Sequence, residues 1–377
     1  MNRIIVFCTG VDSFLQNRIF NPAWAAEFPG AEAMSELAKI ARRQNIEIAT
    51  GDVALSHINA GHWRPEEIML IAEADSRYGL ELGNLGCSPK IILCFESPIF
   101  AWRFYDKLSE ISPKFEHRIL FKGAFDITAE MAGQNHIAYF PAFSRNKIPQ
   151  PKKWAGRKNM VLVAANKYWK KSSRFPLSLN PGKYLKWWQK YKIEKNSPTL
   201  KGAIHNELQS KRLELIEFFA GKGKLDIFGR NWQNFSKLPA CWKKRLKNIL
   251  TNLSPQPCDD KIETISNYKF AAAFENVSYP GYITEKIIDC LVAGVIPVYL
   301  GAADICDFIP KETFIDMRQF DNFEQLDEYM QSFTEKSAVQ MIKAGRDFLG
   351  SPRGDKYSFE NSAEQMFGLL IDSGEKQ

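Results

Sequence analysis

The segment 268–301 constrains the fold more than any other part of this 377-residue chain. It reads as a buried apolar strand, a loop that contains Pro280, a helix that Gly294 ends as a left-handed cap, and a second apolar strand. The expected elements are strands at 269–274 and 296–300 and a helix at 283–293. This strand–loop–helix–strand order is typical of a parallel α/β sheet.

The loop of this unit lies where ligands bind in open α/β sheets, at the carboxyl end of a strand and the N-terminus of a helix. Unpaired backbone N–H groups and the helix dipole favour a phosphate there. The loop and the first helical turn offer Asn276, Tyr282, Glu285 and Lys286. The ammonium of Lys286 suits a diphosphate, and the carboxylate of Glu285 suits sugar or ribose hydroxyls. Periodicity alone leaves a simpler alternative open, in which Glu285 only complements the helix dipole and Lys286 is solvated.

The rest of the chain also alternates strands and helices, and its length favours two domains. The further expected strands are 3–8, 46–49, 90–95, 160–165 and 225–228, and the further helices are 31–43, 66–78 and 207–219. The charged, proline-containing stretch 144–158 predicts a linker. The expected domains are 1–150, 151–345 with an insertion at about 167–202, and a C-terminal helical segment at 346–377.

The seven cysteines are scattered without a Cys-x-x-Cys pair, which predicts buried free thiols rather than disulfides or a zinc site. His57 and His62 are the histidines closest in sequence, and neither helical nor strand periodicity places them on one face. We therefore expect no metal and no cofactor. No apolar run is long enough for a membrane span and the N-terminus lacks a signal-peptide pattern, so a cytoplasmic location is the default expectation.

Positive charge is concentrated in the middle of the chain. Residues 151–250 contain 24 Lys and Arg against 5 Asp and Glu, so the remainder carries −12 within a total of +7. An anionic partner fits this asymmetry, whether a phosphorylated ligand, a membrane surface or a nucleic acid, and a solvated basic face is the alternative. Aromatic residues accompany the charge at 168–171 and 184–188. Three interpretations stay open for them: an acceptor groove, an anionic membrane contact, or a packed hairpin with Trp187 and Trp188 in its core.

The segment 274–301 resembles the signature of glycosyltransferase family 10, the α-1,3/1,4-fucosyltransferases. In that family a Phe-Glu-Asn strand end is followed by Tyr-[Ile/Val]-Thr-Glu-Lys, a small-residue turn and Pro-Val-x-x-Gly. The corresponding residues here are Phe274-Glu275-Asn276, Tyr282-Ile283-Thr284-Glu285-Lys286, Ala293-Gly294 and Pro297-Val298-Tyr299-Leu300-Gly301. Several motifs at fixed spacings are more specific than a lone glycine-rich loop.

Two further motifs are similar to the same family. The Glu96-Ser97-Pro98 tripeptide resembles a motif of the acceptor domain whose glutamate is the proposed base, and Arg212 resembles an arginine that contacts the donor diphosphate. The resemblance thus implies Glu96 as the catalytic residue. It also implies five donor contacts, which are Arg212, Asn276, Tyr282, Glu285 and Lys286.

The resemblance implies an α/β fold of the GT-B type, with two Rossmann-like domains facing across a cleft. It implies inverting, metal-independent transfer of fucose from GDP-fucose to a hydroxyl of an oligosaccharide or glycolipid, in α-1,3 or α-1,4 linkage, as in protein glycosylation or lipopolysaccharide synthesis. Glu96 would remove the acceptor proton, while Lys286, Arg212 and the helix N-terminus would stabilise the leaving GDP. The basic segment leaves peripheral contact with the inner membrane face open.

Departures from the family pattern keep alternatives open. The insertion has no counterpart in that pattern, and Tyr279-Pro280 replaces the usual polar residues, so a GDP-sugar other than GDP-fucose is a rival donor. A catalytically inactive sugar-nucleotide binder and a nucleic-acid-binding protein are further rivals. No nucleic-acid motif accompanies the basic segment, and we therefore expect no nucleic-acid partner.

Overall fold

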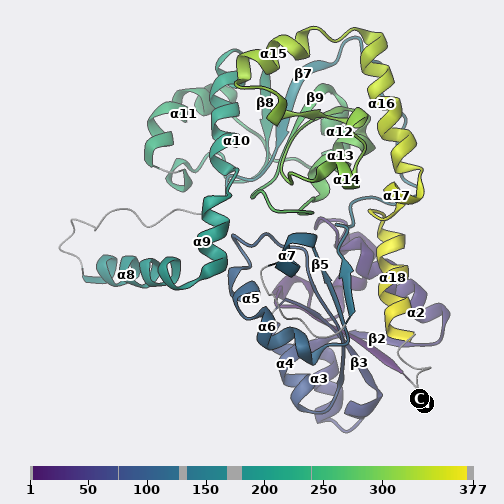
Figure 1. Cartoon of the computed structure of the whole chain (residues 1–377). Coiled ribbons are helices and arrows are strands. Elements are labelled where there is room, and N and C mark those ends of the chain that lie inside the picture. Colours follow the sequence, from purple (N-terminus) through teal and green to yellow (C-terminus); the bar gives the residue numbers. More distant parts are fainter. Residues whose placement is uncertain (1–2, 75, 127–133, 168–180, 239, 372–377) are drawn as a thin grey trace. The chain divides into compact units, whose positions relative to one another are not determined.

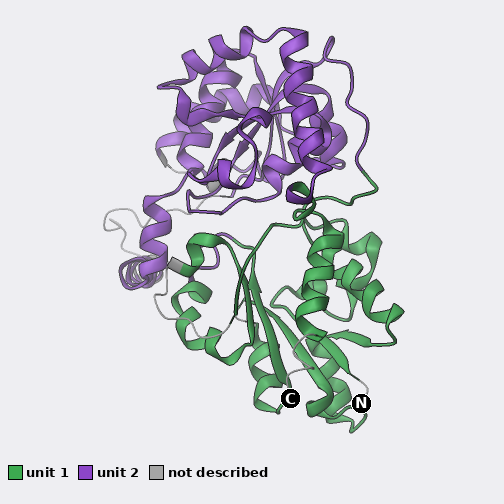
Figure 2. Cartoon of the chain, turned by 45° about the vertical axis from the view of Figure 1, so that its right-hand side comes forward, with its two compact units in different colours: residues 1–96, 103–147, 354–377 green, residues 97–102, 148–353 purple. Residues whose placement is uncertain are grey.

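The computed structural model describes residues 3–74, 76–126, 134–167, 181–238 and 240–371 (Figure 1). Its contacts divide the chain into two compact units (Figure 2). Unit 1 comprises 1–96, 103–147 and 354–377, and unit 2 comprises 97–102 and 148–353. The change of unit after residue 147 falls inside the expected linker. The units differ from the expected domains in two places, because 97–102 group with unit 2 and 354–377 belong to unit 1.

Unit 1 is built on a six-stranded sheet in which neighbouring strands are parallel, in the order β2-β1-β3-β4-β5-β6. The strands are β1 (Ile4–Cys8), β2 (Glu47–Thr50), β3 (Ile68–Glu73), β4 (Ser88–Cys94), β5 (His117–Leu120) and β6 (Gln134–Ile137). The helices are α1 (Pro22–Ala25), α2 (Glu32–Arg43), α3 (Gly51–Asn59), α4 (Arg77–Asn84), α5 (Trp102–Asp106), α6 (Leu108–Ile111), α7 (Lys122–Asp126) and the C-terminal α18 (Phe359–Ile371).

The helix expected at 66–78 is wrong. The chain forms a short 3-10 turn at Pro65–Glu67, then strand β3, and α4 begins only at Arg77. Residues 68–72 are all buried, as in a central strand of a parallel sheet covered on both faces. A short, uniformly apolar run does not distinguish such a strand from a buried helix, which explains the error.

The C-terminal helix α18 completes unit 1 rather than forming a separate segment. Ala363 and Met366 pack in the same apolar cluster as Leu37 of α2. Arg145 fixes the return of the chain through ion pairs with Asp355 (2.6 Å) and Glu364 (2.8 Å). The chain therefore closes unit 1 with residues that follow unit 2 in sequence.

Unit 2 is built on a five-stranded parallel sheet in the order β11-β10-β9-β7-β8. The strands are β7 (Lys158–Val163), β8 (Leu225–Phe228), β9 (Tyr268–Phe274), β10 (Ile296–Leu300) and β11 (Ile315–Asp316). The helices are α8 (Pro181–Asn196), α9 (Pro198–His205), α10 (Gln209–Leu215), α11 (Ala240–Leu253), α12 (Lys261–Ser266), α13 (Glu285–Ala293), α14 (Ile305–Phe308), α15 (Phe323–Gln331), α16 (Glu335–Leu349) and α17 (Pro352–Asp355). The helix expected at 207–219 is α10 continued by a π-helical turn at Ile216–Ala220.

The strand–loop–helix–strand unit predicted at 268–301 is confirmed as β9, a loop, α13 and β10. Gly294 ends α13 in the left-handed conformation, with φ of 65°. A Cβ at this position would also lie 2.8 Å from the Cβ of Pro151, so glycine satisfies both the backbone and the packing.

The expected insertion at 167–202 contains α8 and leads into α9, which together extend from the rest of unit 2 (Figures 1 and 2). The packed interpretation of its tryptophans is wrong for Trp188, whose surface is 39% exposed. The aromatic group expected at 168–171 lies outside the described residues.

Among the described helices, none combines the length and the apolar character that crossing a membrane requires. The cysteines are free thiols, but Cys241 and Cys306 are exposed rather than buried.

Candidate functional site

The buried carboxylate of Glu275 ties the loop after β9 to the first turn of α13. Glu275 follows the strand directly and is fully buried. Its Oε1 accepts a hydrogen bond from the Thr284 backbone N–H (2.8 Å), and its Oε2 accepts one from the Thr284 hydroxyl (2.8 Å). Lys286 Nζ lies 3.0 Å from the same Oε2. A buried charge needs such partners, and these contacts fix where the helix begins.

Two lysines and two acids form a second group of charges on α12 and α13. Lys261 Nζ lies 2.5 Å from Asp289 Oδ2 and 3.7 Å from Glu285 Oε1. Lys286 Nζ lies 3.6 Å from the same Glu285 oxygen, so that Glu285 stands between both ammonium groups. The acid at the first turn of α13 is therefore held by side chains from two helices.

The local charges move the pKa values of these acids in opposite directions. For Glu285, burial acts to raise the pKa, but Lys286 and Lys261 outweigh it and lower the pKa to about 2. For Asp289, burial prevails over the attraction of Lys261 and raises the pKa to about 6, with Glu285 adding to the effect. Glu285 is thus firmly ionised at neutral pH and available as a hydrogen-bond acceptor.

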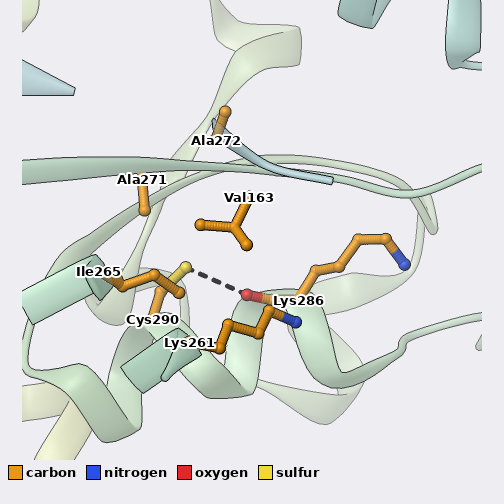
Figure 3. Close-up of a pocket in the computed structure, with 7 residues that line it drawn as sticks. All are labelled: Val163, Lys261, Ile265, Ala271, Ala272, Lys286 and Cys290. Carbon is orange, nitrogen blue, oxygen red and sulfur yellow. Dashed lines mark hydrogen bonds between the residues drawn. The ribbon is translucent and has the colours of Figure 1, made fainter. Parts of the chain in front are cut away.

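A small pocket lies beside this group of charges, between the sheet and helices α12 and α13 (Figure 3). Its lining residues are Val163, Lys261, Ile265, Ala271, Ala272, Lys286 and Cys290. In Figure 3 the ammonium groups of Lys261 and Lys286 lie apart, in agreement with their closest acidic partners, Asp289 and Glu275. Both remain within 3.7 Å of the Glu285 carboxylate at the first turn of α13.

Arg212 and Asn276 meet at the end of β9. Arg212 Nη2 donates to the Phe274 carbonyl (2.7 Å) and lies 3.3 Å from Asn276 Oδ1. The guanidinium is buried, and its Nε has no hydrogen-bond partner among the described residues. A buried N–H without an acceptor is costly, and an oxygen of a bound ligand would satisfy it.

The remaining loop residues are held by neighbouring elements. Tyr282 is buried, and its backbone N–H donates to the Tyr279 carbonyl (3.1 Å). Gly281 adopts a φ of 67°, and its N–H donates to Asp304 Oδ1 (2.8 Å). The Tyr279 hydroxyl lies so close to Gly202 of α9 that a Cβ there would be 2.8 Å away. The side chain of Tyr279 is therefore turned towards α9.

Glu96 lies in unit 1 and is the exposed residue of an otherwise largely buried segment that follows β4. Its backbone carbonyl accepts a hydrogen bond from the Tyr105 hydroxyl (3.1 Å). Nearby Glu73, at the end of β3, is half-buried and accepts a hydrogen bond from the Thr9 hydroxyl (2.6 Å). Burial is the main cause that raises the pKa of Glu73, and the charge of Glu96 adds to it. Two carboxylates thus lie at the carboxyl edge of the unit 1 sheet.

The structure brings the five predicted donor contacts together around the end of β9 and the start of α13, whereas the predicted base Glu96 lies in the other unit. Sequence reasoning missed four charged residues: Glu73, Lys261, Glu275 and Asp289. Glu275 was visible as the centre of the Phe-Glu-Asn motif, and its burial beside Lys286 is the signal that singles it out. Lys261 lies on a separate helix, and no local pattern links it to Glu285.

The two histidines that periodicity separated are in fact close. The rings of His57 and His62 are 5.6 Å apart, because the chain turns back after α3 and the His62 N–H donates to the His57 carbonyl (2.9 Å). The described residues nevertheless contain no group of three or more His, Cys, Asp or Glu side chains that could hold a metal ion.

Comparison with known proteins gives a match to glycosyltransferase family 10 (fucosyltransferase), C-terminal part, over residues 194–341. An α-(1,3)-fucosyltransferase of Helicobacter pylori is 33% identical over 103 residues, which are 27% of this chain and 21% of that protein. A 3-galactosyl-N-acetylglucosaminide 4-α-L-fucosyltransferase of Pan troglodytes is 30% identical over 140 residues, 36% of this chain and 32% of that protein.

Residues 194–341 are thus similar to the C-terminal part of glycosyltransferase family 10. The chain matches only about a fifth to a third of the length of these two relatives. The predicted donor contacts all lie inside the matched range, and Glu96 lies outside it.

Solved structures extend the likeness in fold over the whole chain. A crystal structure of an α1,3-fucosyltransferase covers 98% of this chain, with 90% of its own chain matched, at 14% identity and a TM-score of 0.50. A glycosyltransferase from Rickettsia africae covers 100% of both chains at 9% identity, with a TM-score of 0.55. With the two parallel sheets, this likeness confirms the expected α/β fold of the GT-B type.

Proposed function

We propose that the chain is an inverting fucosyltransferase, which transfers fucose from GDP-fucose to a hydroxyl of a glycan acceptor. The observation that carries the proposal is the site at the start of α13, within the family 10 match. There a helix N-terminus, the ammonium of Lys286 and the buried guanidinium of Arg212 gather positive charge at the edge of a parallel sheet. Such preorganised charge suits a nucleoside diphosphate.

In the proposed reaction, the acceptor oxygen attacks C1 of fucose and loses its proton to the Glu96 carboxylate. The bond between C1 and the diphosphate oxygen breaks, and both bonding electrons leave with GDP. Lys286 and Arg212 stabilise the charge that grows on this leaving group, so the step requires no metal. Glu285, ionised and fixed by Lys286 and Lys261, accepts hydrogen bonds from donor hydroxyls.

The proposed acceptor is an oligosaccharide or a glycolipid, and the name of the Pan troglodytes relative gives a galactosyl-N-acetylglucosaminide as the acceptor of that protein. A GDP-sugar other than GDP-fucose is the second candidate donor, because Tyr279 departs from the family pattern in the donor loop. The side chain of Tyr279 lies against Gly202 of α9, so α9 helps to shape this part of the loop. A panel of donors separates the two candidates.

The test measures nucleotide release from GDP-fucose, GDP-mannose, UDP-galactose and dTDP-linked sugars in the presence of EDTA. We expect release of GDP from GDP-fucose and a loss of about 10²–10⁴ in kcat for Glu96→Gln, the range for a general base. Affinity for GDP, measured by calorimetry, stays unchanged in this variant. Glu110→Gln makes the same change at another exposed glutamate of unit 1 and retains full activity.

Different outcomes overturn different parts of the proposal. Turnover of GDP-mannose but not GDP-fucose replaces the donor sugar and leaves the site intact. Full activity of Glu96→Gln removes this residue as the base. Failure to bind any GDP-sugar rejects the proposed donor site as a whole.

A further inference from the structure

Helix α8 carries a cluster of aromatic side chains that is separate from the donor site. Trp187 and Tyr191, one helical turn apart, stack with ring centroids 5.3 Å apart and planes within 10°. Trp188 stacks on Tyr191 as well, at 6.0 Å. The three rings therefore form a continuous aromatic surface along the helix, which we call the α8 aromatic face.

Two of the three rings of the α8 aromatic face are exposed in the described structure. Trp188 is 39% exposed and Tyr191 38%, and neighbouring Leu185 is 56% exposed. By contrast, Trp232 in the core of the same unit is fully buried. Both views show α8 extending away from the sheet of unit 2 (Figures 1 and 2). Large apolar groups gathered at the surface in this way mark an interaction site.

Lysines accompany the α8 aromatic face along the helix, and helical spacing places Lys192 and Lys195 nearest to it. Over 185–196, Lys186, Lys190, Lys192 and Lys195 stand against the single acid Glu194, a net charge of +3. The ammonium of Lys192 lies 5.3 Å from the ring centroid of Trp188. Tryptophan and tyrosine favour the boundary between lipid headgroups and acyl chains, and lysines beside them reach the phosphates.

We propose that the α8 aromatic face docks on an anionic phospholipid surface. The rings lie at the headgroup level, and the lysines on either side pair with lipid phosphates. Because basic residues border the face closely, the helix lies shallowly and binding is reversible. A neutral glycan would draw no benefit from the four lysines, so charge complementarity favours the lipid surface. The proposal does not rest on the transfer reaction and places this arm of unit 2 at a membrane.

The test is flotation of the full chain with vesicles of phosphatidylcholine alone and of phosphatidylcholine mixed with phosphatidylglycerol. We expect binding only to the mixed vesicles, with added salt weakening it. Each lysine near an anionic surface is worth about 1 kcal/mol, so K192Q/K195Q weakens binding about thirtyfold. W188A/Y191A abolishes flotation, because it removes the rings that anchor the helix.

The matched control is K243Q/K247Q on α11, which removes the same charge from two exposed lysines. The apolar side of α11 already packs in the core of unit 2 through Trp242 and Leu246, so this variant should float as the wild type does. Thermal unfolding of every variant shows whether the fold is kept. The proposal is overturned if the wild type does not float, if both lysine variants weaken binding equally, or if α8 variants lose binding only to a glycan array or an RNA oligonucleotide.

Discussion

The carboxyl edges of the two sheets hold their charged residues in different ways. In unit 2, Glu275 is fully buried and Lys286 is held beside it at 3.0 Å. In unit 1, Glu96 lies exposed in the segment after β4. The edge of unit 2 is thus preorganised by contacts within the chain, whereas Glu96 in unit 1 lies at an exposed position. We therefore expect substitutions at the edge of unit 2 to change both stability and activity, and substitution of Glu96 in unit 1 to change activity alone.

The largest expected difference between the two edges comes from replacing a glutamate by alanine at each of them. Glu275→Ala removes the acceptor of Thr284 and leaves Lys286 without its closest acidic partner. Because losing one member of a buried pair is strongly destabilising, we expect the free energy of unfolding to fall by about 3 kcal/mol. Glu96→Ala, at an exposed position, changes it by about 0.5 kcal/mol or less. Urea unfolding measures both, and equal losses would contradict the contrast.

Within unit 2, the dependence of stability on pH distinguishes Glu285 from Asp289. The pKa of Glu285 is lowered to about 2 in the folded chain, so its ionised form contributes stability above the ordinary pKa that is lost as the pH falls towards 2. The pH dependence that Asp289 gives to stability has the opposite sign. Its pKa is raised to about 6, so its contribution to stability falls as the pH rises through that range. Glu285→Gln should therefore flatten the loss of stability below about pH 4.5, by about 2 kcal/mol.

The measurement is urea unfolding at neutral pH and at a series of acid pH values. Glu312→Gln makes the same change at an exposed glutamate of unit 2 and should leave the acid dependence as it is. An unchanged slope in Glu285→Gln would show that Lys286 and Lys261 do not hold this carboxylate in solution.

How much the sequence predicted also differs between the two regions. In unit 2, glycine at a left-handed position and the alternation of apolar runs with a loop were local signals, and they located β9, α13 and the Gly294 cap correctly. At 66–78 in unit 1, a uniformly apolar run carried no period, and the strand β3 was taken for a helix.

At the candidate site, too, the sequence predicted only what a local pattern contains. One short stretch of the sequence contains Asn276, Tyr282, Glu285 and Lys286, so a motif could group them. Lys261, which pairs with both acids of α13, comes from α12. Contacts between separate elements depend on tertiary packing, and spacing in the sequence does not record them. The pairing of Thr9 with Glu73, which joins the ends of β1 and β3, escaped prediction for the same reason.

The smallest expected effect concerns the pKa of Glu73 at the carboxyl edge of the unit 1 sheet. Burial first, and then the charge of Glu96, raises the pKa of Glu73, so Glu96→Gln should lower that pKa while burial keeps it above the ordinary value. Thr9→Val should raise it further, because the Thr9 hydroxyl stabilises the carboxylate. NMR titration of ¹³C-labelled glutamate measures the pKa, with Glu73→Gln to assign the signal. Glu47→Gln, on edge strand β2, is the matched control. If Glu96→Gln and Glu47→Gln leave the pKa of Glu73 equally unchanged, Glu73 and Glu96 act independently at this edge of the unit 1 sheet.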